Sequence, residues 1–182
     1  MFHYVIDDEF TLRPLAVEHA DAMFKLVGQS RERLRQWLPW VDNATDVSHM
    51  KTYIRNAIKQ GGDNGGFTAG LWVRNELAGV IGFHEIDWHN RSVGIGYWLG
   101  QSYEGQGYMS SACRAMVEHA MLEIELNRVE IRCATGNKAS RAIPERLGFV
   151  FEGVLRQAEK LPGGYVNHAV YGMLRSEWQL LR

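Results

Sequence analysis

The sequence predicts an α+β fold in which a mixed, mostly antiparallel, twisted sheet is flanked by helices. Three observations predict it. Apolar residues recur with a helical period in the first third of the chain, strand-like segments dominate the middle and the end, and one long amphipathic helix separates the two groups of strands. The 182 residues suffice for one sizeable core but hardly for two, so we expect a single domain over 1–182.

The first third is predicted to be mainly helical after a short strand at 10–15. The apolar stripe of its first helix consists of Ala20, Met23, Phe24 and Val27. Two further helices are expected over 31–38, which ends before Pro39, and over 47–59. The glycine-rich segment 61–66 is interpreted as a flexible loop.

Strands are predicted in the middle of the chain at 67–73, 77–83 and 92–99, with turns at 74–75 and 87–90. The long helix that follows has an apolar face made of Met109, Ala112, Cys113, Met116, Val117, Ala120 and Met121. The last third predicts a strand at 128–135 and a short helix at 140–147 that Gly148 closes in a left-handed cap. Two strands, 149–157 and 165–174, then flank a Pro-Gly-Gly turn.

Composition disfavours several classes of protein. The formal net charge of −1 is unlike that of chains that bind nucleic acid through its phosphates. No apolar run is long enough to span a membrane, and the acidic segment 1–9 does not resemble a signal peptide. Only Cys113 and Cys133 occur, without a C-x-x-C pattern, so we expect no disulfide framework, no metal site and a cytoplasmic location.

A glycine-rich loop opens the long helix and is the most informative part of the sequence. Gly105-x-Gly107 lies between the strand 92–99 and the helix. Main-chain N–H groups at such a junction can bind a pyrophosphate. The alternative is that the two glycines only form a tight turn that starts the helix. A dinucleotide fingerprint requires a third small residue three places after Gly107, where Ser110 stands, and an acid at the end of a later strand. No later strand presents such an acid, so this fingerprint does not fit. A P-loop does not fit either, because no lysine is near.

Several ordered motifs around this loop resemble one known family. They are the stretches Ile95 to Leu99, Glu104 to Met109 and Leu126 to Cys133, Asn137-x-x-Ser140, and Arg146-Leu147-Gly148-Phe149-x-x-Glu152-Gly153. In these the chain resembles the GNAT superfamily of N-acetyltransferases, and within it the group of ribosomal-protein N-terminal acetyltransferases typified by RimL and RimJ. The resemblance implies the GNAT acyl-CoA N-acyltransferase fold, with acetyl-CoA as co-substrate.

The resemblance also implies where acetyl-CoA binds. The main chain of Tyr97 and Leu99 is expected to hold the pantetheine arm, with the Leu99 N–H polarising the thioester carbonyl. The whole expected cofactor-binding set is Tyr97, Trp98, Leu99, Gly105, Gln106, Gly107, Tyr108, Met109, Ser110, Asn137 and Ser140. One departure is Ser102, where the family often has Gln or Arg, so the phosphates are expected to rely on the backbone rather than on side-chain charge.

Candidate catalytic groups follow from the same resemblance. Glu159, in the segment 155–159, is the expected general base, and a solvated glutamate near a turn is the alternative. Ser140 is expected to hydrogen-bond the departing sulfur, alone or while also capping its helix. Relatives often carry an acid where this chain has Gly94, which leaves Glu85, with His84, as the reserve proton acceptor.

Three other residues have competing interpretations. Cys133 suits a small core residue better than a covalent acetyl carrier, because no histidine lies near it in sequence. Among the aromatic residues, Trp37 is assigned to helix packing and Trp40 to the wall of the acceptor pocket.

The leading functional hypothesis is direct acetyl transfer to the α-amine of a protein N-terminus, of the ribosomal-protein type. Transfer to a small amine, such as a polyamine, an aminoglycoside or an amino acid, is the alternative within the same chemistry. A non-catalytic acyl-CoA-binding sensor is the alternative from another class. Relatives often form homodimers, but nothing in the residues fixes the oligomeric state.

Overall fold

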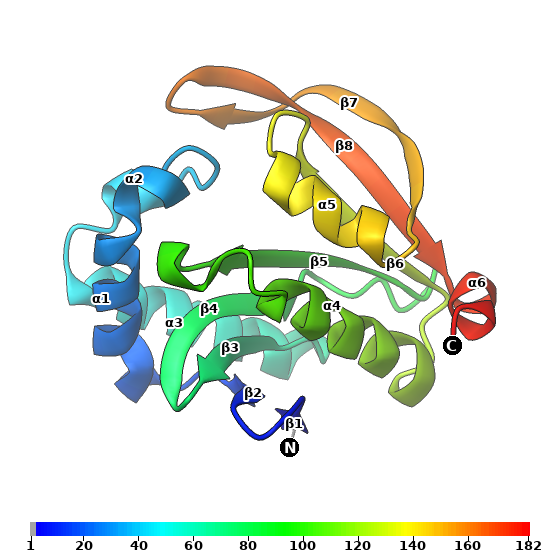
Figure 1. The fold of residues 1–182 in the computed structure, drawn as a ribbon, viewed down its shortest axis with the longest axis horizontal. Coiled ribbons are helices and arrows are strands. Elements are labelled where there is room, and N and C mark those ends of the chain that lie inside the picture. Colours follow the sequence, from blue (N-terminus) through cyan, green and yellow to red (C-terminus); the bar gives the residue numbers. More distant parts are fainter. Residues whose placement is uncertain (1–2) are drawn as a thin grey trace.

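The computed structural model describes residues 3–182, so residues 1–2, where the acidic segment and the expected domain begin, lie outside the described residues. Its strands form one eight-stranded sheet in the order β1-β2-β3-β4-β5-β6-β8-β7 (Figure 1). Their bounds are β1 Tyr4–Val5, β2 Phe10–Pro14, β3 Thr68–Val73, β4 Glu76–Phe83, β5 Ser92–Leu99, β6 Arg128–Ala134, β7 Val150–Leu161 and β8 Gly164–Leu174. The β5–β6 pair is parallel and the other pairs are antiparallel, which confirms the mixed, mostly antiparallel sheet.

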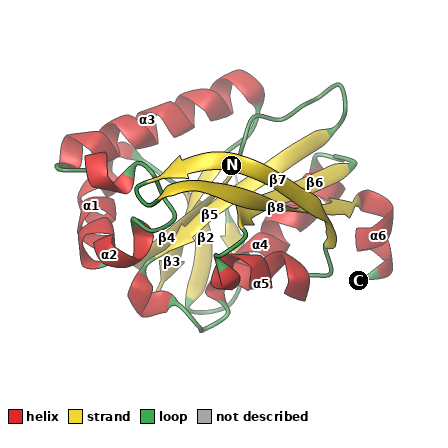
Figure 2. Ribbon diagram, turned by 90° about the horizontal axis from the view of Figure 1, so that it is seen from above, coloured by secondary structure: helices red, strands yellow, loops and turns green. Residues whose placement is uncertain are grey.

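Helices cover both faces of this sheet. Their bounds are α1 Ala20–Gln29, α2 Arg31–Leu34, α3 Val47–Asn64, α4 Tyr108–Glu118, α5 Lys138–Arg146 and α6 Arg175–Leu180. Figure 2 shows α3 on one side of the sheet and α4 with α5 on the other. One core packs α4 against the sheet and includes Ile95, Met116 and Ile131. A second core packs α1 and α3 against the sheet and includes Met23, Ile54 and Trp98.

Helix α3 runs further than the sequence predicts and overturns the loop expected at 61–66 for residues 61–64, whereas Gly65 and Gly66 lie beyond the helix. Asp46 caps its start, where the carboxylate accepts a hydrogen bond from Ser48 N at 2.7 Å, and Gly65, with a φ of 84°, caps its end. The helix crosses two glycines because its last residue, Asn64, is anchored by tertiary contacts. The Asn64 side-chain amide donates to Ile86 O at 3.1 Å, and the main-chain carbonyl of Asn64 accepts from Trp88 Nε1 at 2.7 Å.

Other differences from the predicted elements are small. Helix α2 ends at Leu34 rather than at 38, and β7 continues to Leu161. The sequence predicted neither β1 nor α6. Helix α6 forms because Glu177 accepts a hydrogen bond from Leu174 N at 2.9 Å at its start and because Trp178 is buried in the main core. The Arg74–Asn75 turn between β3 and β4 has both residues at positive φ, as a tight hairpin requires.

Candidate active site

The two parallel strands in the middle of the sheet separate along their length. β5 and β6 are paired only from Ser92 to Gly94, opposite Arg128 to Glu130, and beyond that point they diverge. A cavity of about 1270 Å³ lies at this divergence and is lined by β5, β6, α2, α4, α5 and the β7–β8 hairpin. In Figure 1 the hairpin arches over α5 toward α2. Every residue of the expected cofactor-binding and catalytic sets lines the cavity.

The main chain of β5 is free to bind a ligand on the side that faces the gap. Gly94 O accepts a hydrogen bond from His84 N at 2.9 Å, and Gly100 N donates to Ala78 O at 2.8 Å. Residues 94, 96, 98 and 100 therefore direct their main-chain groups toward β4, because successive residues of a strand alternate. Tyr97 and Leu99 consequently direct their N–H and C=O groups into the cavity.

The loop before α4 has the backbone conformation of an anion-binding turn. Gly105 and Gly107 have φ angles of 75° and 82°, which side-chain-bearing residues rarely adopt. Gly107 is the N-cap of α4, and no side chain caps the helix there. The first N–H groups of α4 have no partner within the helix and give its start a partial positive charge. The site therefore has the donors that a pyrophosphate needs.

Two arginines that the sequence reasoning did not single out also lie at this loop. Arg33 of α2 makes two hydrogen bonds with the Glu104 carboxylate, at 3.1 and 3.0 Å. Arg146 of α5 donates to Ser110 Oγ at 2.6 Å. Both arginines line the cavity, so side-chain charge is present there although Ser102 does not supply it. Arg146 belongs to one of the motifs visible in the sequence. Arg33 belongs to none of them, and only the packing of α2 brings it to the loop.

A hydrogen-bonded pair lies where the pantetheine end of the groove approaches α5. Tyr97 OH donates to Ser140 O at 2.9 Å, and Ser140 Oγ donates to Tyr97 OH at 3.4 Å. Burial raises the pKa of Tyr97 well above its ordinary value, so the phenol stays protonated. Ser140 does not cap α5, because the cap is Asn137, whose side chain accepts from Ser140 N at 3.2 Å. The Ser140 hydroxyl therefore has no capping role, and Ser140 lines the cavity, where its hydroxyl donates to the Tyr97 phenol oxygen.

Cys133 belongs to the main core and also lines the cavity. Burial raises the pKa of its thiol, and a hydrogen bond with Ser140 only partly opposes this. The thiol is therefore protonated at neutral pH and is a poor nucleophile. The structure supports the core interpretation that the sequence favoured.

The other half of the cavity lies on the opposite face of the sheet. Ile95 and Tyr97 face the α4 side, so Gly94, Gly96 and Trp98 face the other side because strand side chains alternate. Arg132 of β6 and His168 of β8 lie on this second face, and both line the cavity with His84. The cavity therefore passes from a glycine-rich phosphate site on one face to a polar chamber on the other.

Glu159 reaches this chamber because β7 bulges. Leu155 pairs with His168, and Glu159 pairs with Val166, so β7 advances four residues while β8 advances two. Within the bulge Gln157 has a φ of 48°, and its N–H donates to Asn167 Oδ1 at 2.8 Å. The bulge turns Glu159 to the cavity, where its Oε1 lies 3.5 Å from His168 Nε2. No sequence signal marked His168, because only the strand register brings the two together.

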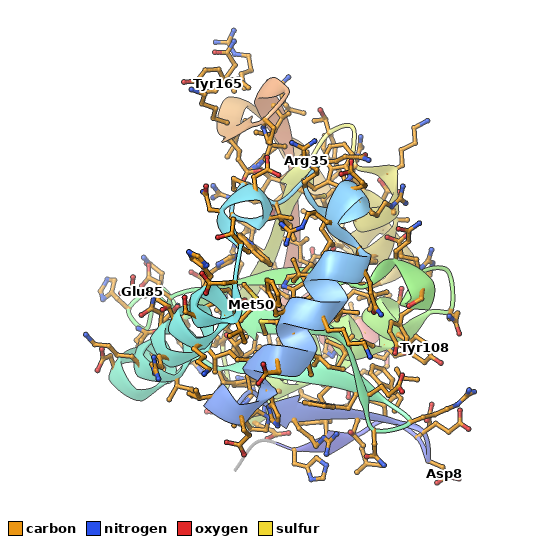
Figure 3. All side chains as sticks on the ribbon, turned by 90° about the vertical axis from the view of Figure 1, so that its left-hand side faces the viewer. Asp8, Arg35, Met50, Glu85, Tyr108 and Tyr165 are labelled. Carbon is orange, nitrogen blue, oxygen red and sulfur yellow. The ribbon has the colours of Figure 1, made fainter. Side chains whose placement is uncertain are left out.

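Two expectations about the acceptor side are wrong. Glu85 is exposed and does not line the cavity, and Figure 3 shows it on the periphery of the molecule. Trp37, rather than Trp40, lines the cavity. Trp40 stacks on Tyr53 and meets Trp98 edge-on, with ring centroids 5.8 and 5.9 Å apart, so it belongs to the second core.

Within residues 3–182 no group of three or more histidines, cysteines and acidic residues could hold a metal ion. In the same part of the chain, no helix combines the length and apolarity that crossing a membrane requires.

Known proteins share this architecture. Residues 9–150 match the family model of the acetyltransferase (GNAT) domain. The chain is 36% identical to the putative ribosomal N-acetyltransferase YdaF of Bacillus subtilis over 98% of both chains. It superposes on the ribosomal-protein alpha-N-acetyltransferase RimL in complex with coenzyme A with a TM-score of 0.91 and 29% identity, over 97% of this chain and 99% of RimL.

A third relative acts in a different process. The microcin C7 self-immunity acetyltransferase MccE, solved in complex with acetyl-CoA and AMP, superposes with a TM-score of 0.89 at 27% identity, over 93% of this chain and 94% of that chain. The GNAT fold, the glycine loop and the divided cavity therefore agree with the family match. The chain belongs to the GNAT acetyltransferase family and is an N-acetyltransferase that uses acetyl-CoA as its co-substrate.

Proposed function

We propose that this enzyme acetylates the α-amine of a protein N-terminus, of the ribosomal-protein type, in the cytoplasm, and that 1–182 forms one catalytic domain. The observation that carries the proposal is the position of Glu159 on the β7 bulge, in the chamber opposite the phosphate-binding loop. The names of YdaF and RimL, which refer to ribosomal acetylation, support this choice of acceptor. The cavity is lined both by α2 and by the β7–β8 hairpin, two elements between which an extended peptide end could bind.

The proposed mechanism assigns one task to each group. Main-chain N–H groups from Gly105 to Ser110 and the nearby arginines bind the phosphates of the co-substrate, which supplies the activated acetyl group. The Leu99 N–H polarises the thioester carbonyl and stabilises the oxyanion. Glu159 accepts a proton from the attacking nitrogen. The Ser140 hydroxyl, which donates to the Tyr97 phenol oxygen at 3.4 Å in the free enzyme, turns to hydrogen-bond the departing sulfur.

A small-molecule acceptor is the second candidate, and the MccE relationship favours it. MccE and RimL resemble this chain about equally, both in TM-score and in sequence identity. The name of MccE refers to immunity against a microcin rather than to a ribosomal protein. The two relatives show that this fold does not by itself select the acceptor.

The deciding experiment measures thiol release from acetyl-CoA with two sets of acceptors side by side. One set contains short peptides with free N-termini, and the other contains polyamines, aminoglycosides and amino acids. We expect the highest kcat/KM with peptides, and none with the same peptides after chemical blocking of their α-amine. Faster turnover of any small amine would replace the proposed acceptor class. Tight binding of coenzyme A without turnover of any amine would contradict the whole proposal.

A further inference from the structure

Acetylation of a protonated amine requires that two protons leave the same nitrogen. An N-terminal amine has a pKa near 8, so at neutral pH it arrives largely as an ammonium ion. One proton must leave before attack, and a second leaves once the nitrogen–carbon bond has formed. When the carbon–sulfur bond breaks, its electron pair goes to sulfur, which takes up one proton, and the other passes to water. A single carboxylate such as Glu159 accepts only one of these protons at a time.

His84 is placed on β5 by two glycines. It directly follows β4, and its imidazole lies across Gly94 and Gly96 of the neighbouring strand. A Cβ atom added to Gly94 would lie 2.8 Å from His84 Cδ2, and one added to Gly96 would lie 3.0 Å from Nε2. Real Cβ atoms essentially never show the first of these approaches, and the second is tighter than nine in ten real Cβ contacts. The absence of side chains at these two positions is therefore what lets the ring occupy this part of the chamber.

The charges around this imidazole keep it neutral and available. Partial burial lowers the pKa of His84, the Arg132 guanidinium on β6 lowers it further, and Glu130 on the same strand opposes them. Glu159 and His168, from the hairpin, line the same cavity. The side chain is accessible from the cavity, and its ring makes no hydrogen bond with another of residues 3–182. A neutral imidazole with free nitrogen atoms can accept a proton there.

We propose that His84 is a second proton acceptor of the reaction, which takes the first proton from the arriving ammonium ion and releases it to water at the open side of the chamber. Glu159 then takes the second proton from the attached nitrogen. This assignment rests on the proposed function, because it needs an amine acceptor in the chamber. A neutral imidazole can accept the first proton, and its lowered pKa then favours release of that proton to water.

The test compares His84→Gln with His89→Gln, an exposed histidine that does not line the cavity. The acceptor is the amine that the wild-type enzyme acetylates fastest. For a peptide α-amine, we expect His84→Gln to lower kcat/KM about tenfold near pH 6.5 and less than about twofold near pH 9, where the amine arrives neutral. Binding of coenzyme A, measured by calorimetry, should stay unchanged. A purely structural role would give a defect that does not fade as the pH rises.

The glycines provide a second variant that leaves His84 itself intact. We expect Gly94→Ala to displace the ring and to reproduce the pH-dependent defect, and to add no further loss to His84→Gln, because both changes remove the same group. If amines are acetylated but His84→Gln behaves as His89→Gln does, the role of His84 is wrong while the proposed function stands. If the wild-type enzyme acetylates no amine at all, both proposals are wrong.

Discussion

Arg33 and Glu104 form a bidentate ion pair that joins helix α2 to the phosphate-binding loop. Beside it the buried Ser30 hydroxyl accepts a hydrogen bond from Gln101 N at 2.9 Å. These contacts connect the helices on the acceptor side with the loop on the cofactor side. The loop is therefore positioned by residues about seventy places earlier in the chain, and not only by its own glycines.

Arg33→Ala should weaken coenzyme A binding roughly fivefold, because it removes a cation from the cavity and releases Glu104 beside the phosphates. The loss of folding stability should be small, since an exposed ion pair contributes about 0–1 kcal/mol. Calorimetry and thermal melting measure the two effects. Lys25→Ala removes the same charge from α1 outside the cavity and should leave affinity unchanged. Equal affinities for the two variants would show that Arg33 does not contribute to the phosphate site.

Glu159→Gln should lower kcat at least about tenfold, because the amide cannot accept the proton of the attacking nitrogen. The affinity for acetyl-CoA should be nearly unchanged, since Glu159 lies in the chamber on the far side of the sheet from the loop. Steady-state kinetics with the preferred amine checks this. Glu85→Gln, which alters an exposed acid outside the cavity, is the matched control and should behave as wild type. Undiminished turnover of Glu159→Gln would remove this residue from the mechanism.

Cys133→Ala should retain turnover within about threefold of wild type, whereas removal of a true nucleophile costs at least about a hundredfold. The reason is the raised pKa of the buried thiol, which makes the reactive thiolate scarcer near neutral pH than in an exposed cysteine. Mass spectrometry of enzyme incubated with acetyl-CoA alone provides an independent check. An acetylated Cys133 that disappears on adding amine would overturn the direct-attack mechanism.

Gly107→Val should weaken coenzyme A binding at least tenfold, but not because the new side chain meets protein. A Cβ on Gly107 has no atom within 4 Å. The cause is the φ of 82°, which a β-branched residue adopts only with strain of about 1–2 kcal/mol, so the loop changes shape. Gly163→Ala, at an open position without positive φ, is the control and should bind normally. Calorimetry on the folded variants decides between these outcomes.

The sequence predicted the parts of the site that depend on local chemistry. The strand 92–99, the turn glycines and the following helix agree with the structure because glycine conformation and apolar period act over a few residues. It did not predict the side-chain contact between Glu159 and His168, which depends on a bulge, or that Trp37 rather than Trp40 lines the cavity. Both features depend on strand register and helix placement, which residues close together in the sequence do not determine. Residues 61–64 show the same limit, because contacts from Ile86 and Trp88 to Asn64 fix them as helix.

Two adjacent glycines in this segment should respond to alanine in opposite directions. Gly62 lies in α3 with no atom within 4 Å of an added Cβ, so Gly62→Ala should raise stability by about 0.5–1 kcal/mol through helix propensity. A Cβ on Gly61 would lie 2.6 Å from Gly66 O, a main-chain atom, so Gly61→Ala should lower stability although alanine favours a helix. Urea unfolding of both variants measures the difference. A flexible loop would give two small, similar changes, because neither added methyl group would meet a fixed neighbour.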